Sequence, residues 1–353
     1  MSTCCSEAVR KAMLRTVVIL SVFSSLSLSA NAFSRIVAFG DSLTDDCTMG
    51  ISRVIDNAVG NNQPYPGVPY YKGCIFSNGP PYPVVAAGIL NVSLTNYAKG
   101  GATSGAVPAY AVLPAGYANN SMPITIEIPS TLEQVVEYLD DVNGTASSDA
   151  IYFLFVGSND YFPILSGTSN ATVEDVLEAT AEALDMLYQA GARLFYTQLL
   201  PFLGNSPRAM AAGPEAVAFT NAVTTAHNSQ LAALIPQFAA FHLDASIILF
   251  NFEAFTSQAG AAFGITDLTT PCYNSSAWVV ASEPPVCANP DSHAYWDEVH
   301  PSARVHQLWG QAVAAQLMPF ASTTSTTSRK LLAQEDTFEG SHLGTSRRLG
   351  LPF

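Results

Sequence analysis

Basic residues are scarce in this chain of 353 residues, which has 14 Lys and Arg against 28 Asp and Glu. Charged residues make up only 12% of the chain, and its formal net charge at pH 7 is −14. The first 32 residues carry three basic residues and one acidic residue, so the remaining chain has a formal charge of −16. A chain this acidic repels phosphate backbones and anionic lipid headgroups. We therefore expect neither nucleic acid nor an anionic membrane surface as a partner.

The sequence also lacks an apolar run long enough to cross a membrane. Its best candidate, residues 16–28, is interrupted by serines, whereas a spanning helix needs about 20 mainly apolar residues. Basic residues precede this run, and Ala30-Asn31-Ala32 has the small-x-small pattern of a signal-peptide cleavage site. We interpret residues 1–32 as a secretory signal peptide and predict a secreted, extracellular protein without stable membrane insertion. A membrane anchor is the alternative interpretation of this segment.

Cysteine is rare, and the Cys-x-x-Cys pattern typical of zinc sites is absent. Outside the first 32 residues, four cysteines remain, an even number that can form two disulfides in an oxidising compartment. A bond between Cys272 and Cys287 would close a loop of about 15 residues. Cys47 and Cys74 would then remain to pair, although the sequence alone leaves the connectivity open. Five N-x-[ST] sequons are expected on surface loops of a glycoprotein; they begin at Asn91, Asn119, Asn143, Asn170 and Asn274.

Hydrophobic residues make up 48% of the chain, enough for a sizeable core. No linker divides residues 33–321, so we expect a single domain there, followed by a Ser, Thr and charge-rich disordered tail over 322–353. Apolar runs typical of buried strands alternate with helical patterns, which predicts an α/β fold with a parallel sheet covered on both faces. Residues 50–90 are rich in Pro, Gly and Tyr and are expected to be irregular. We predict strands over 35–39, 92–98, 150–156, 194–200 and 246–251, and helices over 131–139, 172–189, 214–238 and 305–317.

Ser42 follows the first of these apolar runs in Phe39-Gly40-Asp41-Ser42-Leu43. A strand that ends at a glycine delivers the next hydroxyl to the edge of the sheet, where nucleophiles are commonly held. A serine hydroxyl is a weak nucleophile and needs a base within hydrogen-bond reach, which is itself oriented by an acceptor. Asp297 and His300 lie three residues apart near the end of the domain and suit these roles. The chain order Ser, Asp, His is one of the known arrangements of such residues.

These residues resemble the GDSL or SGNH hydrolases, in particular the secreted eukaryotic GDSL lipases and esterases. Four blocks in the family order carry the resemblance and span nearly all of residues 33–321. They are Gly40-Asp41-Ser42-Leu43, Asn96-Tyr97-Ala98-Lys99-Gly100-Gly101-Ala102, Gly157-Ser158-Asn159-Asp160 and Asp297-Glu298-Val299-His300-Pro301. The resemblance implies a three-layer, flavodoxin-like fold with a mainly parallel five-stranded sheet in the order 2-1-3-4-5. It also implies Ser42, Asp297 and His300 as catalytic residues.

An oxyanion hole made by the Ser42 N–H, a glycine N–H and the Asn159 amide is a further implication of the resemblance. Gly100 and Gly101 are both candidates, and the family spacing favours Gly101. We expect the Asp41 side chain to accept backbone N–H groups in the turn that holds Ser42. His227 is expected to be a hydrogen-bonded core or helix-end residue. His293 and His306 lie near His300, but their spacing matches no usual ligand motif, so we predict neither a metal nor a cofactor.

The sequence therefore predicts a monomeric serine hydrolase that cleaves carboxylic esters through an acyl-enzyme, with a small-molecule or glycan ester as substrate. Acetyl or short-chain esters, including those on carbohydrate, are the first expectation. A lipase, phospholipase or acyltransferase acting on lipid esters is the alternative, and a non-catalytic glycan-binding protein is a third.

Aromatic residues of the 50–90 segment are expected either to line a cleft or to attach that segment to the sheet. They are Tyr65, Tyr70, Tyr71, Phe76 and Tyr82.

Overall fold

The structure is a computed structural model, and its described residues are 32–165, 168–259, 264–274 and 285–321. Residues 1–31 of the predicted signal peptide and the predicted tail 322–353 lie outside the described residues. Within these described ranges, no helix has the length and apolar character needed to cross a membrane.

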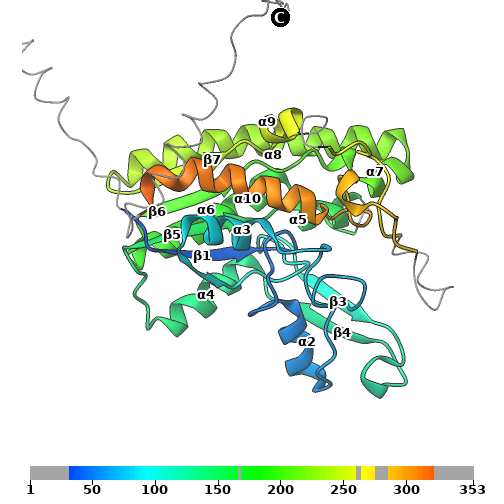
Figure 1. The fold of residues 1–353 in the computed structure, drawn as a ribbon. Helices are drawn as coiled ribbons and strands as arrows, with labels where there is room; N and C mark the ends of the chain where they lie inside the picture. Colours follow the sequence, from blue (N-terminus) through cyan, green and yellow to red (C-terminus); the bar gives the residue numbers. More distant parts are fainter. Residues whose placement is uncertain (1–31, 166–167, 260–263, 275–284, 322–353) are drawn as a thin grey trace, which may run out of the picture.

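A five-stranded parallel sheet forms the centre of the fold (Figure 1). Its spatial order is β2-β1-β5-β6-β7, which confirms the predicted order of the five strands. The first residue of each observed strand lies within one residue of the predicted start. The strands are β1 (Arg35–Gly40), β2 (Ser93–Asn96), β5 (Ala150–Phe155), β6 (Leu194–Gln198) and β7 (Ser246–Phe250).

Helices connect the strands and cover both faces of the sheet, as the alternating pattern predicted. The four predicted helices correspond to α4 (Thr131–Asp141), α6 (Val173–Gln189), α8 (Pro214–Phe241) and α10 (Ala303–Leu317). Further helices are α2 (Ile51–Val59), α3 (Tyr82–Leu90), α5 (Ser158–Leu165), α7 (Pro207–Ala212) and α9 (Phe252–Ala259).

Alternate residues of β1 belong to two separate cores, because successive side chains of a strand point to opposite faces. Ile36 and Ala38 join the core beneath α3 and α10, whereas Val37 and Phe39 join the core beneath α4 and α6. All four side chains are buried. This burial on both faces explains why the segment is continuously apolar rather than alternating.

The segment between β1 and β2 is more regular than expected. Residues 50–90 contain the helices α2 and α3, of which α3 packs on α10. Most of the prolines and glycines in this segment fall between the helices or at their ends: Gly60 ends α2 in the left-handed conformation, with φ of 65°. A second difference is the antiparallel hairpin of β3 (Ala109–Leu113) and β4 (Ile124–Ile128), which lies beside α2 (Figure 1).

Candidate active site

Ser42 lies in the turn directly after β1, at the carboxyl end of the sheet. Gly40 makes this turn possible: its φ is +153°, and a Cβ there would collide with the carbonyl oxygen of Phe155 on the neighbouring strand. Asp41 Oδ1 accepts a hydrogen bond from the Leu43 N–H at 3.0 Å, which confirms the expected bracing of the turn. Ser42 is only 9% exposed.

His300, which is 258 positions further along the chain, lies next to the Ser42 hydroxyl. Its Nε2 lies 2.9 Å from Ser42 Oγ, and its Nδ1 lies 2.6 Å from Asp297 Oδ2. The other carboxylate oxygen of Asp297 accepts the backbone N–H groups of Val299 and His300 at 2.9 and 2.8 Å. The structure therefore brings the three predicted residues into one continuous chain of hydrogen bonds.

A backbone hydrogen bond closes the loop that carries Asp297 and His300. The Trp296 N–H donates to the carbonyl of His300 at 2.8 Å, and α10 begins immediately afterwards. Ser302 is the N-cap of that helix: its hydroxyl oxygen accepts the Val305 N–H. Because the helix is anchored to the core through its apolar face, this cap fixes the position of the loop relative to Ser42.

Asp297 is buried, which alone would raise its pKa. The charge of His300, hydrogen bonds from His300 and Tyr70, and the Val299 N–H together outweigh burial and hold the pKa of Asp297 below its usual range. The residue is therefore an ionised acceptor for the imidazole Nδ1–H. Tyr70 is part of this arrangement, since its hydroxyl lies 2.7 Å from Asp297 Oδ2.

The glycine and asparagine of the predicted oxyanion hole both line one cavity of about 650 Å³. Asn159 Nδ2 donates one hydrogen to the Ala102 carbonyl at 2.9 Å, which orients the amide and leaves its second hydrogen for a ligand. The Gly100 N–H is occupied by Asp45, whereas those of Gly101 and Ser42 make no hydrogen bond to any described residue. The geometry thus favours Gly101 over Gly100 as an oxyanion donor, a role that stays a prediction.

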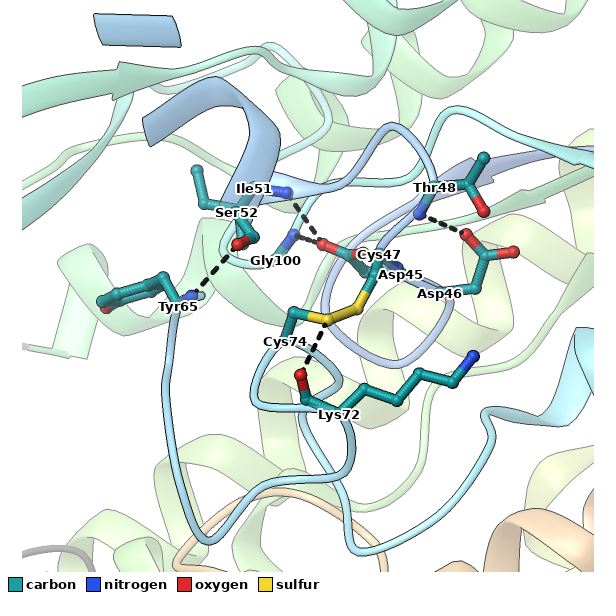
Figure 2. Close-up of a disulfide and its surroundings, with 10 residues drawn as sticks. All are labelled: Asp45, Asp46, Cys47, Thr48, Ile51, Ser52, Tyr65, Lys72, Cys74 and Gly100. Atoms are coloured by element: carbon teal, nitrogen blue, oxygen red, sulfur yellow. Dashed lines mark hydrogen bonds between the residues drawn. A yellow bond between two sulfur atoms is a disulfide. The ribbon is translucent and has the colours of Figure 1, made fainter. Parts of the chain in front are cut away.

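Asp45 supports the site in a way that the sequence analysis missed (Figure 2). Its Oδ2 accepts the N–H groups of Gly100 and Ile51 at 2.8 and 3.0 Å, and its Oδ1 accepts the Cys47 N–H at 2.9 Å. Burial raises the pKa of Asp45 to about 6, although these hydrogen bonds act in the opposite direction. An acidic residue shortly before α2 is the only sequence signal that could have pointed to this role.

A second missed carboxylate is Asp160, which follows Asn159. It accepts the N–H and the hydroxyl of Ser104, with distances between 2.7 and 3.1 Å. Burial raises the pKa of Asp160 to about 7, opposed by the hydrogen bonds from Ser104. The contact connects the loop after Gly101 to the first turn of α5, which carries Asn159.

The three other histidines named from the sequence have structural partners of their own. His227 is buried in α8 and lies 2.6 Å from the Tyr161 hydroxyl, as expected of a core residue, and burial lowers its pKa to about 4. His306 accepts the Tyr82 N–H at 3.2 Å, and burial lowers its pKa to about 3. Nδ1 of His293 lies 3.0 Å from the Thr270 carbonyl. Across the ranges that the structure describes, no cluster of three or more His, Cys, Asp or Glu side chains could hold a metal.

Two disulfides connect Cys47 with Cys74 and Cys272 with Cys287, the pairing that the sequence left open. The first links the turn after Ser42 to the Tyr-rich loop, residues 61–81 between α2 and α3; Figure 2 shows the bond between Cys47 and Cys74. The second lies in a small cluster with Tyr273 and Trp296, beside Tyr70.

Of the two interpretations of these five aromatic residues, attachment to the central sheet is supported for Tyr82, which belongs to the core beneath α3 and α10. Tyr82 stacks on Trp309 with ring centroids 4.0 Å apart, and Phe76 lies 5.2 Å from the His300 ring. None of the five lines the cavity next to Asn159 or a second, apolar cavity of about 400 Å³. Their main role in the structure is packing around the site.

An α/β fold with a parallel sheet, and a hydrogen-bonded Ser-His-Asp arrangement at its carboxyl edge, defines a class of proteins built around an activated serine. A family model described as GDSL-like Lipase/Acylhydrolase matches residues 36–313. The chain therefore belongs to this family.

Curated relatives are similar to parts of the chain. A GDSL esterase/lipase of Arabidopsis thaliana is 31% identical over 198 residues, which cover 49% of this chain and 54% of the relative. An acetylesterase of Hypocrea jecorina is 29% identical over 191 residues, 51% of each protein. The matched part thus spans about half the length of these two relatives. A phosphatidylcholine-sterol acyltransferase of Aeromonas hydrophila is 26% identical over 329 residues, 81% of this chain and 90% of the relative.

Proposed function

We propose that the chain is a carboxylic ester hydrolase in which Ser42 is the nucleophile. The observation that carries the proposal is the 2.9 Å separation of His300 Nε2 from Ser42 Oγ, with Asp297 held against the opposite ring nitrogen. Nε2 takes the hydroxyl proton while Oγ forms a bond to the ester carbonyl carbon. The ionised Asp297 stabilises the imidazolium that results.

The tetrahedral intermediate carries a negative oxygen that needs donors. The Ser42 and Gly101 N–H groups and the remaining amide hydrogen of Asn159 supply them. When the intermediate collapses, the ester C–O bond breaks and the imidazolium gives its proton to the departing alcohol. Water then adds to the acyl-serine by the same route, and its attack releases the acid and restores the Ser42 hydroxyl.

The test is a comparison of Ser42→Ala with Ser229→Ala, an exposed serine on α8. We expect Ser42→Ala to abolish hydrolysis of p-nitrophenyl acetate and covalent labelling by a fluorophosphonate, with Ser229→Ala unchanged. Labelling requires an activated hydroxyl, so it also separates the enzyme from a glycan-binding protein with the same fold. A wild-type chain that is folded yet neither hydrolyses nor labels would refute the proposal.

We also propose that the protein is secreted and glycosylated. Two disulfides support an oxidising compartment, and the sequon residues Asn91, Asn119, Asn143 and Asn170 are all exposed. Expression in a eukaryotic host should release protein that begins at Phe33 and loses mass on treatment with a glycosidase. Retention in the cytosol with the first 32 residues intact would contradict this part.

Acetyl and other short-chain esters are the first candidate substrates. The cavity that contains Gly101 and Asn159 has the hydroxyl groups of Thr103 and Ser169 in its wall, beside apolar side chains such as Val107 and Ile128. The resemblance to an acetylesterase over half the chain agrees with this choice.

A lipid ester is the second candidate, favoured by the apolar cavity of about 400 Å³. This volume lies within the range of pockets for small ligands. Leu43 and Val299, the chain neighbours of Ser42 and His300, form part of its wall together with Phe202, Phe252 and Leu308. The alignment with a lipid acyltransferase covers most of the chain and agrees with an apolar substrate.

A series of p-nitrophenyl esters with increasing acyl length separates the two candidates. A maximum of kcat/KM at the acetyl ester would support the first, and a maximum at long chains would support the second. Adding a sterol or another alcohol during turnover tests acyl transfer, because a transferase would form a new ester in place of free acid.

A further inference from the structure

Tyr70 connects the Tyr-rich loop to the acid of the site. Its hydroxyl lies 2.7 Å from Asp297 Oδ2, the same oxygen that lies 2.6 Å from His300 Nδ1. The two residues are separated by 227 positions in the sequence, so this contact depends on the fold rather than on local geometry. Asp297 Oδ2 therefore has two donors, one on the imidazole and one on the phenol.

The Tyr70 hydroxyl can act only as a donor in this contact. Burial, and then the charge of Asp297, raise the pKa of Tyr70 well above its usual range, with smaller contributions from Tyr273 and Glu298. The phenol thus keeps its proton wherever Asp297 is ionised. A neutral donor to a buried carboxylate makes a strong, charge-assisted hydrogen bond.

The ring of Tyr70 is held on several sides. It makes edge-to-face contacts with Tyr273, Trp296 and Phe76, with ring centroids 5.5, 6.4 and 6.2 Å away. Its backbone N–H donates to the Gly67 carbonyl at 3.1 Å. The hydroxyl is therefore presented to Asp297 by a packed surround, which is what a group that positions another one requires.

We propose that Tyr70 is a positioning residue of the Ser42, His300 and Asp297 site: its hydroxyl fixes the Asp297 carboxylate and takes up part of that group's negative charge. The inference rests on the proposed ester hydrolase function. The groups that face Asp297 are His300, Tyr70 and the backbone N–H donors of its own loop, with Glu298 and Tyr273 nearby. Tyr70 is the side chain of the loop before α3 that hydrogen-bonds to Asp297, while Phe76 of the same loop packs against the His300 ring.

Tyr70→Phe removes the donor and keeps the ring, and Tyr71→Phe is the matched control because Tyr71 is exposed and makes no contact with Asp297. We expect a roughly ten- to hundredfold lower kcat for Tyr70→Phe, with KM nearly unchanged, because the Asp297 carboxylate loses a donor that holds it in place and so orients the His300 imidazole less well for proton transfer. Without the Tyr70 donor, the Asp297 carboxylate keeps more of its negative charge and stabilises the protonated form of His300 more strongly. The acid limb of the pH profile of kcat/KM should therefore move to higher pH.

A merely structural role would leave that acid limb in place. We expect Tyr70→Phe and Tyr71→Phe to unfold at similar urea concentrations, and the downfield proton of the His300–Asp297 hydrogen bond to shift only in Tyr70→Phe. Adding Tyr70→Phe to Asp297→Asn should lower the rate of fluorophosphonate labelling no further, because residues that act through one another are not additive.

Three results would overturn the inference. One is a kcat and pH profile of Tyr70→Phe equal to those of Tyr71→Phe, in a wild-type enzyme that does hydrolyse esters. Another is a further loss of labelling rate when Tyr70→Phe is added to Asp297→Asn. This comparison also tests the inference if Tyr70→Phe turns out to be less stable than the wild type. The last is an inactive wild type, which would remove the proposed function and this inference with it.

Discussion

The Asp45 carboxylate accepts the Gly100 N–H at 2.8 Å and thereby joins the turn after Ser42 to the loop that presents Gly101. The same oxygen accepts the N–H of Ile51 at the start of α2. One buried side chain thus sets the distance between the proposed nucleophile and a proposed oxyanion donor. Gly50 is required beside it, because a Cβ at that position would overlap the carboxylate.

Asp45→Asn is expected to lower both stability and kcat. An amide presents one acceptor where the carboxylate serves three N–H groups, so at least one buried donor loses its partner, at a cost of about 1–3 kcal/mol. Displacement of Gly101 should reduce kcat more than it raises KM.

Urea denaturation and ester hydrolysis measure the two effects separately. The matched control is Asp46→Asn, because within the described part of the chain the Asp46 carboxylate accepts only the exposed Thr48 N–H. Equal behaviour of the two variants would show that Asp45 has no special part in the site.

The disulfide between Cys272 and Cys287 should stabilise the chain and the loop before α10. It encloses a separation of 15 residues, for which the chain-entropy model gives about 3 kcal/mol. The Cys272 N–H donates to the Tyr295 carbonyl at 3.0 Å, and the Tyr273 N–H donates to that of Trp296 at 2.6 Å. The loop carrying Asp297 is therefore attached to the disulfide-bonded segment.

We expect Cys272→Ser/Cys287→Ser to unfold at lower urea concentration and to lose activity at temperatures where the wild type keeps it. Activity and circular dichroism recorded on one temperature ramp check this. Loss of activity together with global unfolding, at the same midpoint, would argue against a local effect on the Asp297 loop.

Asp160 gives a prediction on the pH dependence of stability. Burial raises the pKa of Asp160 to about 7 in the folded chain, above its value of about 3.9 in an unfolded chain. Between these values the folded state holds a proton that the unfolded state has lost. The free energy of unfolding should therefore fall as pH rises from about 4 to about 7, by on the order of 4 kcal/mol from this group.

The comparison of wild type with Asp160→Asn isolates this contribution. The difference between their free energies of unfolding should change steadily over that pH range. The contributions of His227, His306 and the other titrating groups are the same in both proteins and cancel in the difference. Urea denaturation at several pH values measures it, and parallel curves for the two proteins would contradict the assignment.

Much of the fold was predictable from the sequence because the sheet is buried on both faces. Strands such as β5, whose six residues are all buried, read as unbroken apolar runs. The hairpin of β3 and β4 was not predicted, because Tyr110 and Val112 on its outer face are exposed although apolar. Helix α3 was missed for a different reason: its residues are apolar almost all round, so no helical periodicity marks it.

The candidate site was predictable where chemistry demands particular residue types, as for Ser42, Asp297 and His300. The supporting residues Asp45, Tyr70 and Asp160 carry no such signal. Each acts through a contact with a segment distant in sequence, at separations of 55, 227 and 56 residues. Only the packed structure brings these partners together.

Asn159→Ala tests the proposed oxyanion hole. The amide is oriented by its 2.9 Å hydrogen bond to the Ala102 carbonyl and faces the cavity that it shares with Gly101. Because a donor aimed at developing charge acts chiefly in the transition state, its loss should lower kcat by about a hundred- to a thousandfold with a small change in KM. Tyr110→Ala is the control, since Tyr110 lines the same cavity but is 54% exposed. It should change KM and leave kcat nearly intact. If Asn159→Ala instead raised KM at constant kcat, Asn159 would bind the substrate and not the oxyanion.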